Sequence, residues 1–200
     1  MIKSIGIFCG SAKGSKATYV ESAKLMARLL ANKNIGIVYG GGNIGLMGTI
    51  ADETIAHKGE IIGVIPTHLL EKELAHENLT ELIEVKDMGE RKDNMIALSD
   101  AFLILPGGYG TMDELFEVLS LNQLHLINKP CLIYNIEGYF DTLITFILHA
   151  VEQGFVKKEH LSFLIVDNTP EALFEKLGNF VPEHNLDNWI VELKGGKNPE

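Results

Sequence analysis

The chain has 200 residues, of which 46% are hydrophobic and 22% charged, and its formal net charge is −10 at pH 7. These values are ordinary for a globular protein that buries a full core, so we predict a single domain over residues 1–193 and a frayed tail over residues 194–200. The acidic balance argues against a partner such as nucleic acid, because proteins that bind the phosphate backbone carry basic faces.

Short apolar runs alternate with amphipathic stretches along the chain. The runs predict strands at residues 4–9, 36–39, 61–65, 82–85, 101–105, 130–134 and 163–166. The amphipathic stretches predict helices at residues 19–31, 46–57, 91–98, 112–124, 139–152 and 171–177. Near-continuous apolar strands that alternate with helices are typical of a parallel sheet covered on both faces. We therefore predict an α/β fold, a doubly wound Rossmann-like parallel sheet with helices on both faces.

The N-terminal segment lacks the long apolar region of a secretory signal, and no apolar run approaches the ~20 residues of a membrane span. Cys9 and Cys131 lie in apolar runs without C-x-x-C spacing, which favours a reducing compartment. We therefore expect a cytoplasmic protein with no membrane partner. Cys9 precedes Gly-Ser and could be a nucleophile, but a small core residue at the end of a strand is the favoured interpretation.

Three glycine-marked loops, at residues 10–11, 40–45 and 106–110, follow predicted strands. All strands of a parallel sheet point the same way, so these loops share one edge of the sheet. A shared rim of backbone N–H groups suits a phosphorylated ligand. The candidate binding residues in the first two loops are Gly10, Ser11, Gly41 and Gly42.

Gly40, Gly42 and Gly45 match the G-x-G-x-x-G pattern of dinucleotide sites. The match follows the second predicted strand rather than the first, and no acidic residue stands at the end of the next strand. These two details favour a mononucleotide phosphate site or close helix packing. An NAD-dependent oxidoreductase remains as an alternative.

The third loop opens the stretch LPGGYGTMDELFE at residues 105–117. Thr111 is predicted to cap the following helix, with Glu114 completing a T-x-x-E capping box and Asp113 in the first turn. A capping box does not need three preceding glycines. The glycines therefore indicate close approach by a ligand, and the carboxylates beside them indicate chemistry on that ligand.

Arg91 and Lys92 begin the predicted helix at residues 91–98, where basic side chains oppose the helix dipole. They are either a solvated charge cluster or a group that grips a phosphate or a carboxylate. The seven histidines form no metal-ligand pattern, so no metal site is predicted. Ser11 and Ser120 lack the surroundings of a hydrolase nucleophile.

Residues 106–114 fit the pattern P-G-G-x-G-T-x-x-E in full, and GGGNIGLMG at 40–48, CGS at 9–11, ERK at 90–92 and EGYF at 137–140 accompany it. On these motifs the chain resembles, over about residues 1–180, the Lonely Guy family of cytokinin-activating phosphoribohydrolases, long labelled possible lysine decarboxylases. One departure is Gly89, because the family usually has His at this position.

The resemblance implies hydrolysis of the N-glycosidic bond of a purine nucleoside 5′-monophosphate, AMP or N6-prenylated AMP, to free base and ribose 5-phosphate, with no cofactor. Arg91 and Glu114 match the catalytic pair of the family. The matching substrate-binding positions are Glu73, Lys92, Gly108, Tyr109, Gly110, Thr111, Met112, Asp113 and Ser120. The family also implies a homodimer or a higher homo-oligomer, with the site near a subunit interface.

This chemistry accounts for a carboxylate beside an anion-binding loop. Positive charge develops at the ribose C1′ during cleavage, so Glu114 would stabilise that charge and orient or deprotonate water. The backbone of residues 108–111 would hold the 5′-phosphate, and Arg91 would neutralise the phosphate or fix Glu114. Lysine decarboxylation would need a lysine that binds pyridoxal phosphate, and none can be singled out. A non-catalytic nucleotide or cofactor carrier on the same fold is the main alternative, and it could dispense with Glu114.

Overall fold

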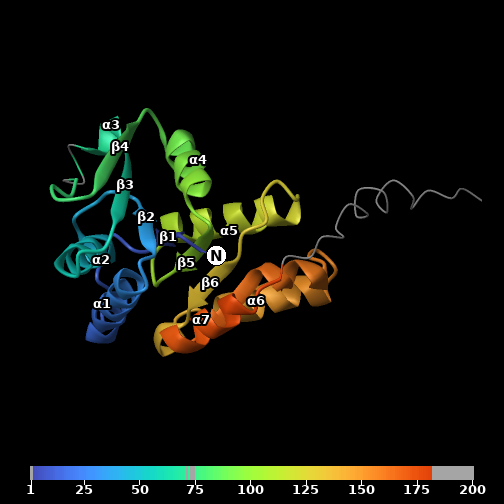
Figure 1. Ribbon diagram of the computed structural model, residues 1–200. Coiled ribbons are helices and arrows are strands. Elements are labelled where there is room, and N and C mark those ends of the chain that lie inside the picture. Colours follow the sequence, from blue (N-terminus) through green and yellow to red (C-terminus); the bar gives the residue numbers. More distant parts are fainter. Residues whose placement is uncertain (1, 71, 73–74, 182–200) are drawn as a thin grey trace, which may run out of the picture.

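The computed structural model describes residues 2–70, 72 and 75–181, and Figure 1 shows the arrangement of their helices and strands. Seven parallel strands form one sheet in the order β4-β3-β2-β1-β5-β6-β7. The strands are β1 (Ser4–Phe8), β2 (Gly36–Tyr39), β3 (Ile61–Pro66), β4 (Glu81–Val85), β5 (Ala101–Ile104), β6 (Cys131–Tyr134) and β7 (Leu164–Asp167). The predicted α/β class and every predicted strand are confirmed.

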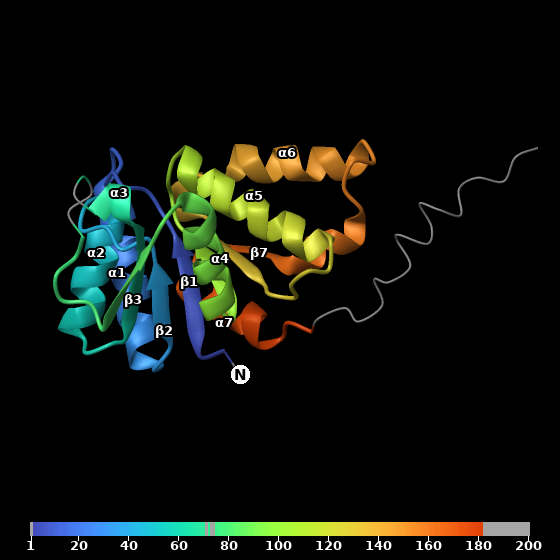
Figure 2. The ribbon, with the colours of Figure 1, turned by 90° about the horizontal axis from the view of Figure 1, so that it is seen from above.

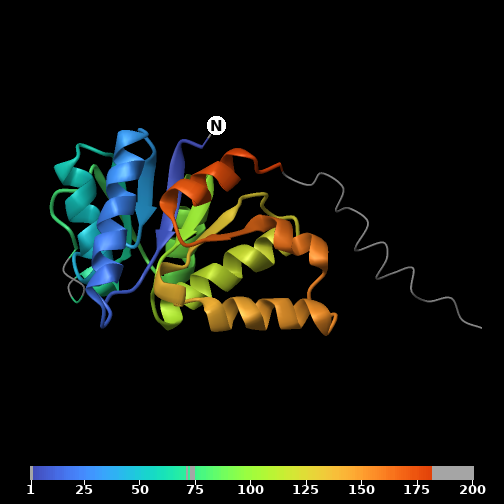
Figure 3. The same cartoon turned by 90° about the horizontal axis from the view of Figure 1, so that it is seen from below.

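Helices cover both faces of the sheet. They are α1 (Ala17–Asn32), α2 (Gly45–Ala56), α3 (Thr67–Leu70), α4 (Met88–Leu98), α5 (Tyr109–Gln123), α6 (Asp141–Glu152) and α7 (Pro170–Gly178), with short 3₁₀ turns η1 (Ile136–Gly138) and η2 (Lys158–Phe163). Figures 2 and 3 show α1 beside α2 at one end of the molecule and α5 beside α6 at the other.

Two apolar clusters, one on each face of the sheet, form the core. On one face, alternate side chains of the central strands, such as Ile5 and Ile37, pack against α1, α2 and α7. On the other face, side chains such as Val38 and Phe102 pack against α4, α5 and the start of α6. Alternate residues of β2 therefore enter opposite clusters, as expected for a strand that is buried on both sides.

The sheet order reverses between β1 and β5, and this point positions the candidate site. From β1 the chain runs outward through β2, β3 and β4, and then returns to the other side of β1 as β5. The loops that leave β1 and β5 therefore diverge. In open α/β sheets a crevice for ligands forms at such a reversal, outside the carboxyl ends of the strands.

Among the described residues, no helix is long and apolar enough to cross a membrane. Residues 182–193 of the predicted domain, and the tail predicted at residues 194–200, lie outside the described part of the chain.

Candidate active site

A cavity of about 210 Å³ opens at the sheet reversal between β1 and β5. The loops after β1, β2 and β5 and the first turns of α4 and α5 surround it. Its lining consists of Ile7, Cys9, Gly10, Ser11, Gly40, Met47, Met88, Arg91, Gly108, Tyr109, Gly110, Thr111, Asp113 and Glu114. The structure therefore brings together both residues of the predicted catalytic pair and most of the predicted binding loop.

Helix α5 begins earlier than predicted. Its N-cap is Gly108, whereas Thr111 is the third helical residue, makes no capping bond and is buried. The predicted capping box is therefore wrong, and Asp113 and Glu114 lie beyond the first turn. Glycine is tolerated at an N-cap because the chain there leaves helical geometry, so the glycine loop runs directly into the helix.

This early start leaves backbone donors facing the cavity. The first intrahelical bond runs from the N–H of Met112 to the carbonyl of Gly108 (3.1 Å), so the N–H groups of Tyr109, Gly110 and Thr111 lack intrahelical acceptors. A Cβ at Gly108 or Gly110 would meet no atom within 4 Å. The end of the helix thus has unpaired N–H groups, a positive dipole and no side chain at Gly108 or Gly110, which suits an anion.

At Gly107, glycine is required for close packing within the protein. A Cβ at this position would overlap the Oγ1 of Thr111 and lie 2.8 Å from the backbone nitrogen of Gly10. The carbonyl of Gly107 accepts a hydrogen bond from the hydroxyl of Tyr139 (2.6 Å), and the N–H of Gly10 donates to the carbonyl of Pro106 (3.0 Å). These contacts hold the loops after β1 and β5 together at the floor of the crevice.

Glu114 is the carboxyl group of the cavity whose pKa is shifted toward neutrality. Burial raises the pKa of its carboxyl from 4.5 to about 7; Arg91 opposes this rise in pKa, and the neighbouring Asp113 adds to it. Glu114 can therefore both hold and release a proton near neutral pH. Groups with such shifted pKa values in a cleft are candidates for acid–base catalysis.

Arg91 is buried, with 6% of its surface exposed, on the α4 side of the cavity. Its Nη2 donates to the carbonyl of Gly40 (3.1 Å), and its Nη1 lies 3.5 Å from the sulfur of Met88. Its Nε is buried without a partner in the described part of the chain. A buried guanidinium with spare donors beside a cavity suits an anionic ligand.

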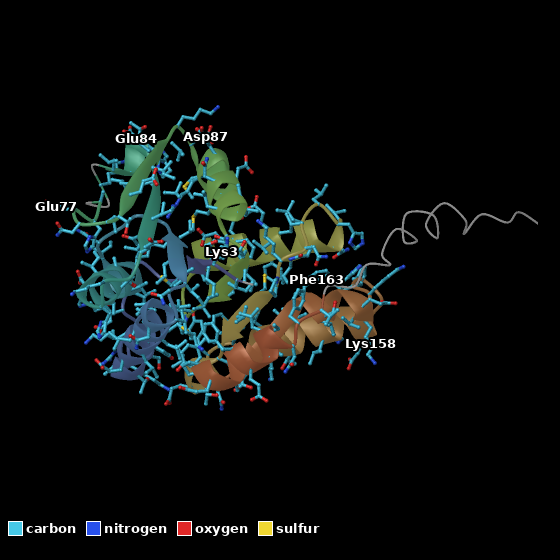
Figure 4. The ribbon with its side chains drawn as sticks, in the orientation of Figure 1. Lys3, Glu77, Glu84, Asp87, Lys158 and Phe163 are labelled. Atoms are coloured by element: carbon cyan, nitrogen blue, oxygen red, sulfur yellow. The ribbon has the colours of Figure 1, made fainter. Side chains whose placement is uncertain are left out.

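The sequence also mispredicted the start of α4. Helix α4 begins at Met88, and the Asp87 carboxylate caps it by accepting from the N–H of Glu90 (2.9 Å). The Glu90 carboxylate in turn accepts from the N–H of Lys86 (2.9 Å), the residue before the cap, so these two side chains together fix the start of the helix. Figure 4 labels Asp87 at this end of α4. Arg91 is therefore the fourth helical residue and points inward from an anchored helix end.

Lys92 does not line the cavity but joins α4 to α5. Its ammonium forms ion pairs with Asp113 (3.0 Å) and Glu117 (2.9 Å), and these pairs raise the pKa of Lys92. Glu114 lies on α5 between the two acidic residues. The positive charge of Lys92 thus compensates the acidic neighbours of Glu114 and leaves Arg91 as the cation on the cavity wall.

Cys9 lines the cavity as a neutral thiol. Burial raises its pKa far above the usual range, and the nearby Glu114 carboxyl raises that pKa further. A thiolate is therefore strongly disfavoured here, which supports the structural interpretation over the nucleophilic one.

Several predicted binding residues lie away from the cavity. Gly41 has a φ of +79° and its carbonyl accepts from the N–H of His76 (3.1 Å), whereas Gly42 pairs with Ala75. Met112 packs against the core under α5. Ser120 lies six residues beyond Glu114 and borders a second groove between α5 and α6. Glu73 lies outside the described residues.

The sequence prediction left out five residues of the lining, namely Ile7, Gly40, Met47, Met88 and Cys9, which was favoured as a core residue. Gly40 and Met47 belong to the glycine-rich motif at 40–48, so the motif itself was the available signal. Within this motif, Cβ atoms at Gly45 and Gly48 would overlap the backbone of Ser11 and Asn43 respectively. Close packing of loops and helix, one of the two favoured interpretations, accounts for these two glycines.

Comparison with known proteins agrees with this geometry. The family described as possible lysine decarboxylase matches residues 47–177. The probable cytokinin riboside 5′-monophosphate phosphoribohydrolase LOG6 of Arabidopsis thaliana is 44% identical over 182 residues, which cover 91% of this chain and 90% of that protein. The cytokinin riboside 5′-monophosphate phosphoribohydrolase LOG1 of the same plant is 42% identical over 197 residues, covering 96% and 92%.

Solved structures show the same fold at lower identity. The molybdenum cofactor binding protein of Rippkaea orientalis superposes with a TM-score of 0.66 at 20% identity, covering 90% of this chain and 97% of that one. The molybdenum cofactor carrier protein of Chlamydomonas reinhardtii gives 0.65 at 14% identity, covering 90% and 98%. The full-length similarity to the plant proteins and the matched family model show that the chain belongs to the Lonely Guy family.

Proposed function

We propose that the protein hydrolyses the N-glycosidic bond of a purine nucleoside 5′-monophosphate and releases the free base and ribose 5-phosphate. The observation that carries this proposal is the placement of Glu114, with its pKa near 7, on the same cavity as the bare N-terminus of α5 and the buried Arg91. The relatives named above are phosphoribohydrolases of cytokinin nucleotides, which supports the same reaction class.

The bond-breaking step leaves positive charge at the ribose C1′, and an ionised Glu114 is the group that stabilises it. The same carboxylate takes a proton from the attacking water, for which a pKa near the working pH is favourable. The departing base accepts a proton from solvent or from the protonated Glu114. Arg91 is a poor proton donor because a guanidinium stays charged at any accessible pH.

The phosphate end of the substrate would bind at the N–H groups of Tyr109, Gly110 and Thr111. Gly108 and Gly110 leave open space beside these donors, so a phosphate oxygen can reach the backbone. Arg91, on the opposite wall, would neutralise part of the phosphate charge. The ribose then spans the distance between the anion-binding backbone and the Glu114 carboxylate.

The apolar side chains of Ile7, Met47 and Met88 form the rest of the wall and would contact the sugar or the base. AMP and N6-prenylated AMP are the two candidate substrates. Methionine side chains adapt to ligand shape, so this wall is compatible with either base.

The decisive experiment incubates purified protein with AMP and with N6-isopentenyl-AMP and follows free base and ribose 5-phosphate by chromatography. Glu114→Gln, which nearly preserves volume, should bind both nucleotides but lose at least ~100-fold of the rate. The ratio of kcat/KM for the two nucleotides ranks the substrates. Tight binding of both nucleotides by wild type without any release of base would refute the hydrolase and favour a nucleotide carrier.

We further propose that the protein is a homodimer or a higher homo-oligomer. Large apolar side chains are exposed along α5 and α6, among them Phe116, Phe146 and Leu148. A groove of about 210 Å³ between these helices is lined mainly by apolar groups. Figures 2 and 3 show the two helices side by side on one face of the molecule. An apolar face of this kind is typical of a surface that another protein covers.

A further inference from the structure

The guanidinium of Arg91 lies directly on the backbone of Gly40, across 51 positions of the sequence. Its Nη2 donates to the Gly40 carbonyl at 3.1 Å, within a buried environment. A Cβ built on Gly40 would overlap Nη2, lie 3.0 Å from Cζ and lie 3.2 Å from the sulfur of Met47. Any side chain at position 40 would therefore occupy the space of the guanidinium.

The backbone at Gly40 does not itself require glycine. Gly40 is not among the residues with a positive φ, in contrast to its neighbour Gly41 at +79°. Alanine could adopt the conformation of Gly40 without strain. The steric demand at this position comes from the atoms facing it, and Nη2 of Arg91 is the nearest of them.

We propose that Gly40 is a positioning residue for the hydrolase, because its missing side chain leaves the space that holds the Arg91 guanidinium in the cavity that Glu114 also lines. This inference rests on the function proposed above. It also assigns a role to the first glycine of the G-x-G-x-x-G match, which is to accommodate an arginine of the same chain rather than a ligand.

The position of the guanidinium beside Gly40 affects two properties of the site. A guanidinium held at Gly40 keeps its positive charge fixed on the cavity wall, where an anionic ligand can bind. It also lowers the pKa of Glu114 against the effect of burial. If a side chain at position 40 displaces the guanidinium, both phosphate binding and the ionisation of Glu114 change, although Arg91 and Glu114 themselves are unaltered.

The test combines Gly40→Ala with Arg91→Lys. A lysine ammonium lacks the Nη2 atom that the new Cβ would meet, so the double variant relieves the overlap that Gly40→Ala creates in the wild-type background. Gly178→Ala is the matched control, because Gly178 ends α7, has no positive φ and a Cβ there would meet no atom within 4 Å.

Two readouts separate positioning from a general structural effect. The first is the pKa of Glu114, followed by NMR of the ¹³C-labelled carboxyl group, whose signal is assigned by its loss in Glu114→Gln. The second is kcat on the better nucleotide. Gly40→Ala should raise the pKa of Glu114 and lower kcat by about 10- to 100-fold, as expected when a charged group is misplaced by about 1 Å. Gly178→Ala should match wild type in both.

The decisive comparison is between Arg91→Lys and the double variant, which should agree within about twofold in kcat. The proposal is overturned if the losses of the single variants multiply in the double variant, or if Gly40→Ala has the wild-type pKa of Glu114. If Gly40→Ala does not fold, recovery of folding in the double variant supports the proposal. A double variant that also fails to fold refutes it. If wild type releases no base, the hydrolase fails, but the NMR titrations still decide whether Gly40 seats Arg91.

Discussion

Glu114 is the residue whose chemistry depends most directly on its surroundings. Burial raises its pKa to about 7, and the proposed mechanism requires an ionised Glu114 for both charge stabilisation and proton abstraction. We therefore expect kcat to fall about tenfold per pH unit on the acidic side and to level off above a midpoint of about 7 or higher, because the bound phosphate anion also opposes ionisation of Glu114. Stopped assays at saturating nucleotide between pH 5 and pH 9 measure this profile.

The substrate phosphate titrates near pH 6, so kcat/KM carries a second transition and kcat is the clean quantity. A kcat that stays constant from pH 5 to pH 9 would contradict the role given to Glu114.

The raised pKa of Glu114 also affects the stability of the folded protein. The folded state binds more protons than the unfolded chain between pH 4.5 and about 7, so Glu114 lowers the free energy of unfolding as pH rises through this range. Glu114→Gln should accordingly be more stable than wild type by about 1–3 kcal/mol at pH 8.

At the scale of single residues, the sequence predicted which charged side chains meet better than it predicted how they pack. Charges near a glycine loop made Arg91 and Glu114 candidates, the family resemblance paired them, and the structure brings both to one cavity. The glycines were harder to interpret, because the space left by a missing side chain can be filled by a ligand or by a neighbouring group of the protein. Gly108 and Gly110 face open space, whereas Gly107 and Gly40 make room for Thr111 and Arg91. Only the three-dimensional partners distinguish these cases.

At the scale of elements, α4 and α5 act as one unit through Lys92. Its ammonium bridges Asp113 and Glu117, and its charge lowers the pKa of Glu114. Lys92→Met should raise the pH midpoint of kcat, because the two acidic neighbours of Glu114 lose their counter-charge. We expect a loss of about 1 kcal/mol in the free energy of unfolding, since Asp113 is largely solvated.

The kinetic profile also tests the role that family resemblance assigns to Lys92. Contact with substrate predicts a large rise in KM, whereas the bridge predicts a shifted midpoint with KM little changed. Lys24→Met, which removes an exposed ion pair with Glu21 on α1, controls for the loss of one surface charge. An unchanged midpoint in Lys92→Met would contradict the bridge as a determinant of the Glu114 pKa.

Helix starts were the elements that the sequence predicted least well. A T-x-x-E pattern placed the cap of α5 at Thr111, yet the helix begins after Gly108. Side-chain and glycine caps compete at such sites, and the outcome depends on tertiary contacts such as the burial of Thr111 against Gly107. The same three-residue error at α4 hid the Asp87 cap and the bond from the N–H of Lys86 to the Glu90 carboxylate. Strands were predicted closely because each is a short apolar run, and in the five central strands these runs are buried on both faces.

At the scale of the whole molecule, strand direction was predictable but strand order was not. Parallel strands imply that the three glycine loops share one edge, and residues of all three loops line the cavity. The order β4-β3-β2-β1-β5-β6-β7 separates the second loop from the reversal point by one strand. Gly41 and Gly42 therefore turn toward residues 75–76. Pairings across the sheet are non-local, so no local pattern encodes them.

The apolar face of α5 and α6 leads to the last prediction, which concerns assembly. Phe146 is 59% exposed at the groove between the two helices, so a carboxylate there would be buried unpaired in an interface. We expect wild type to sediment as a dimer or larger species, and Phe146→Glu to shift it toward monomer by at least ~100-fold in dissociation constant. Sedimentation velocity over a concentration series measures this shift.

The matched control is Leu25→Glu, because Leu25 is 43% exposed on α1, on the opposite face of the sheet. This variant should assemble like wild type. Helix α5 carries Glu114 near one end and the apolar face along its length, so assembly and catalysis share one rigid element. Loss of the dimer in Phe146→Glu should therefore also lower kcat/KM. A wild-type protein that remains monomeric at every concentration would exclude α5 and α6 as a subunit interface, and the exposed apolar groove would then need a different partner.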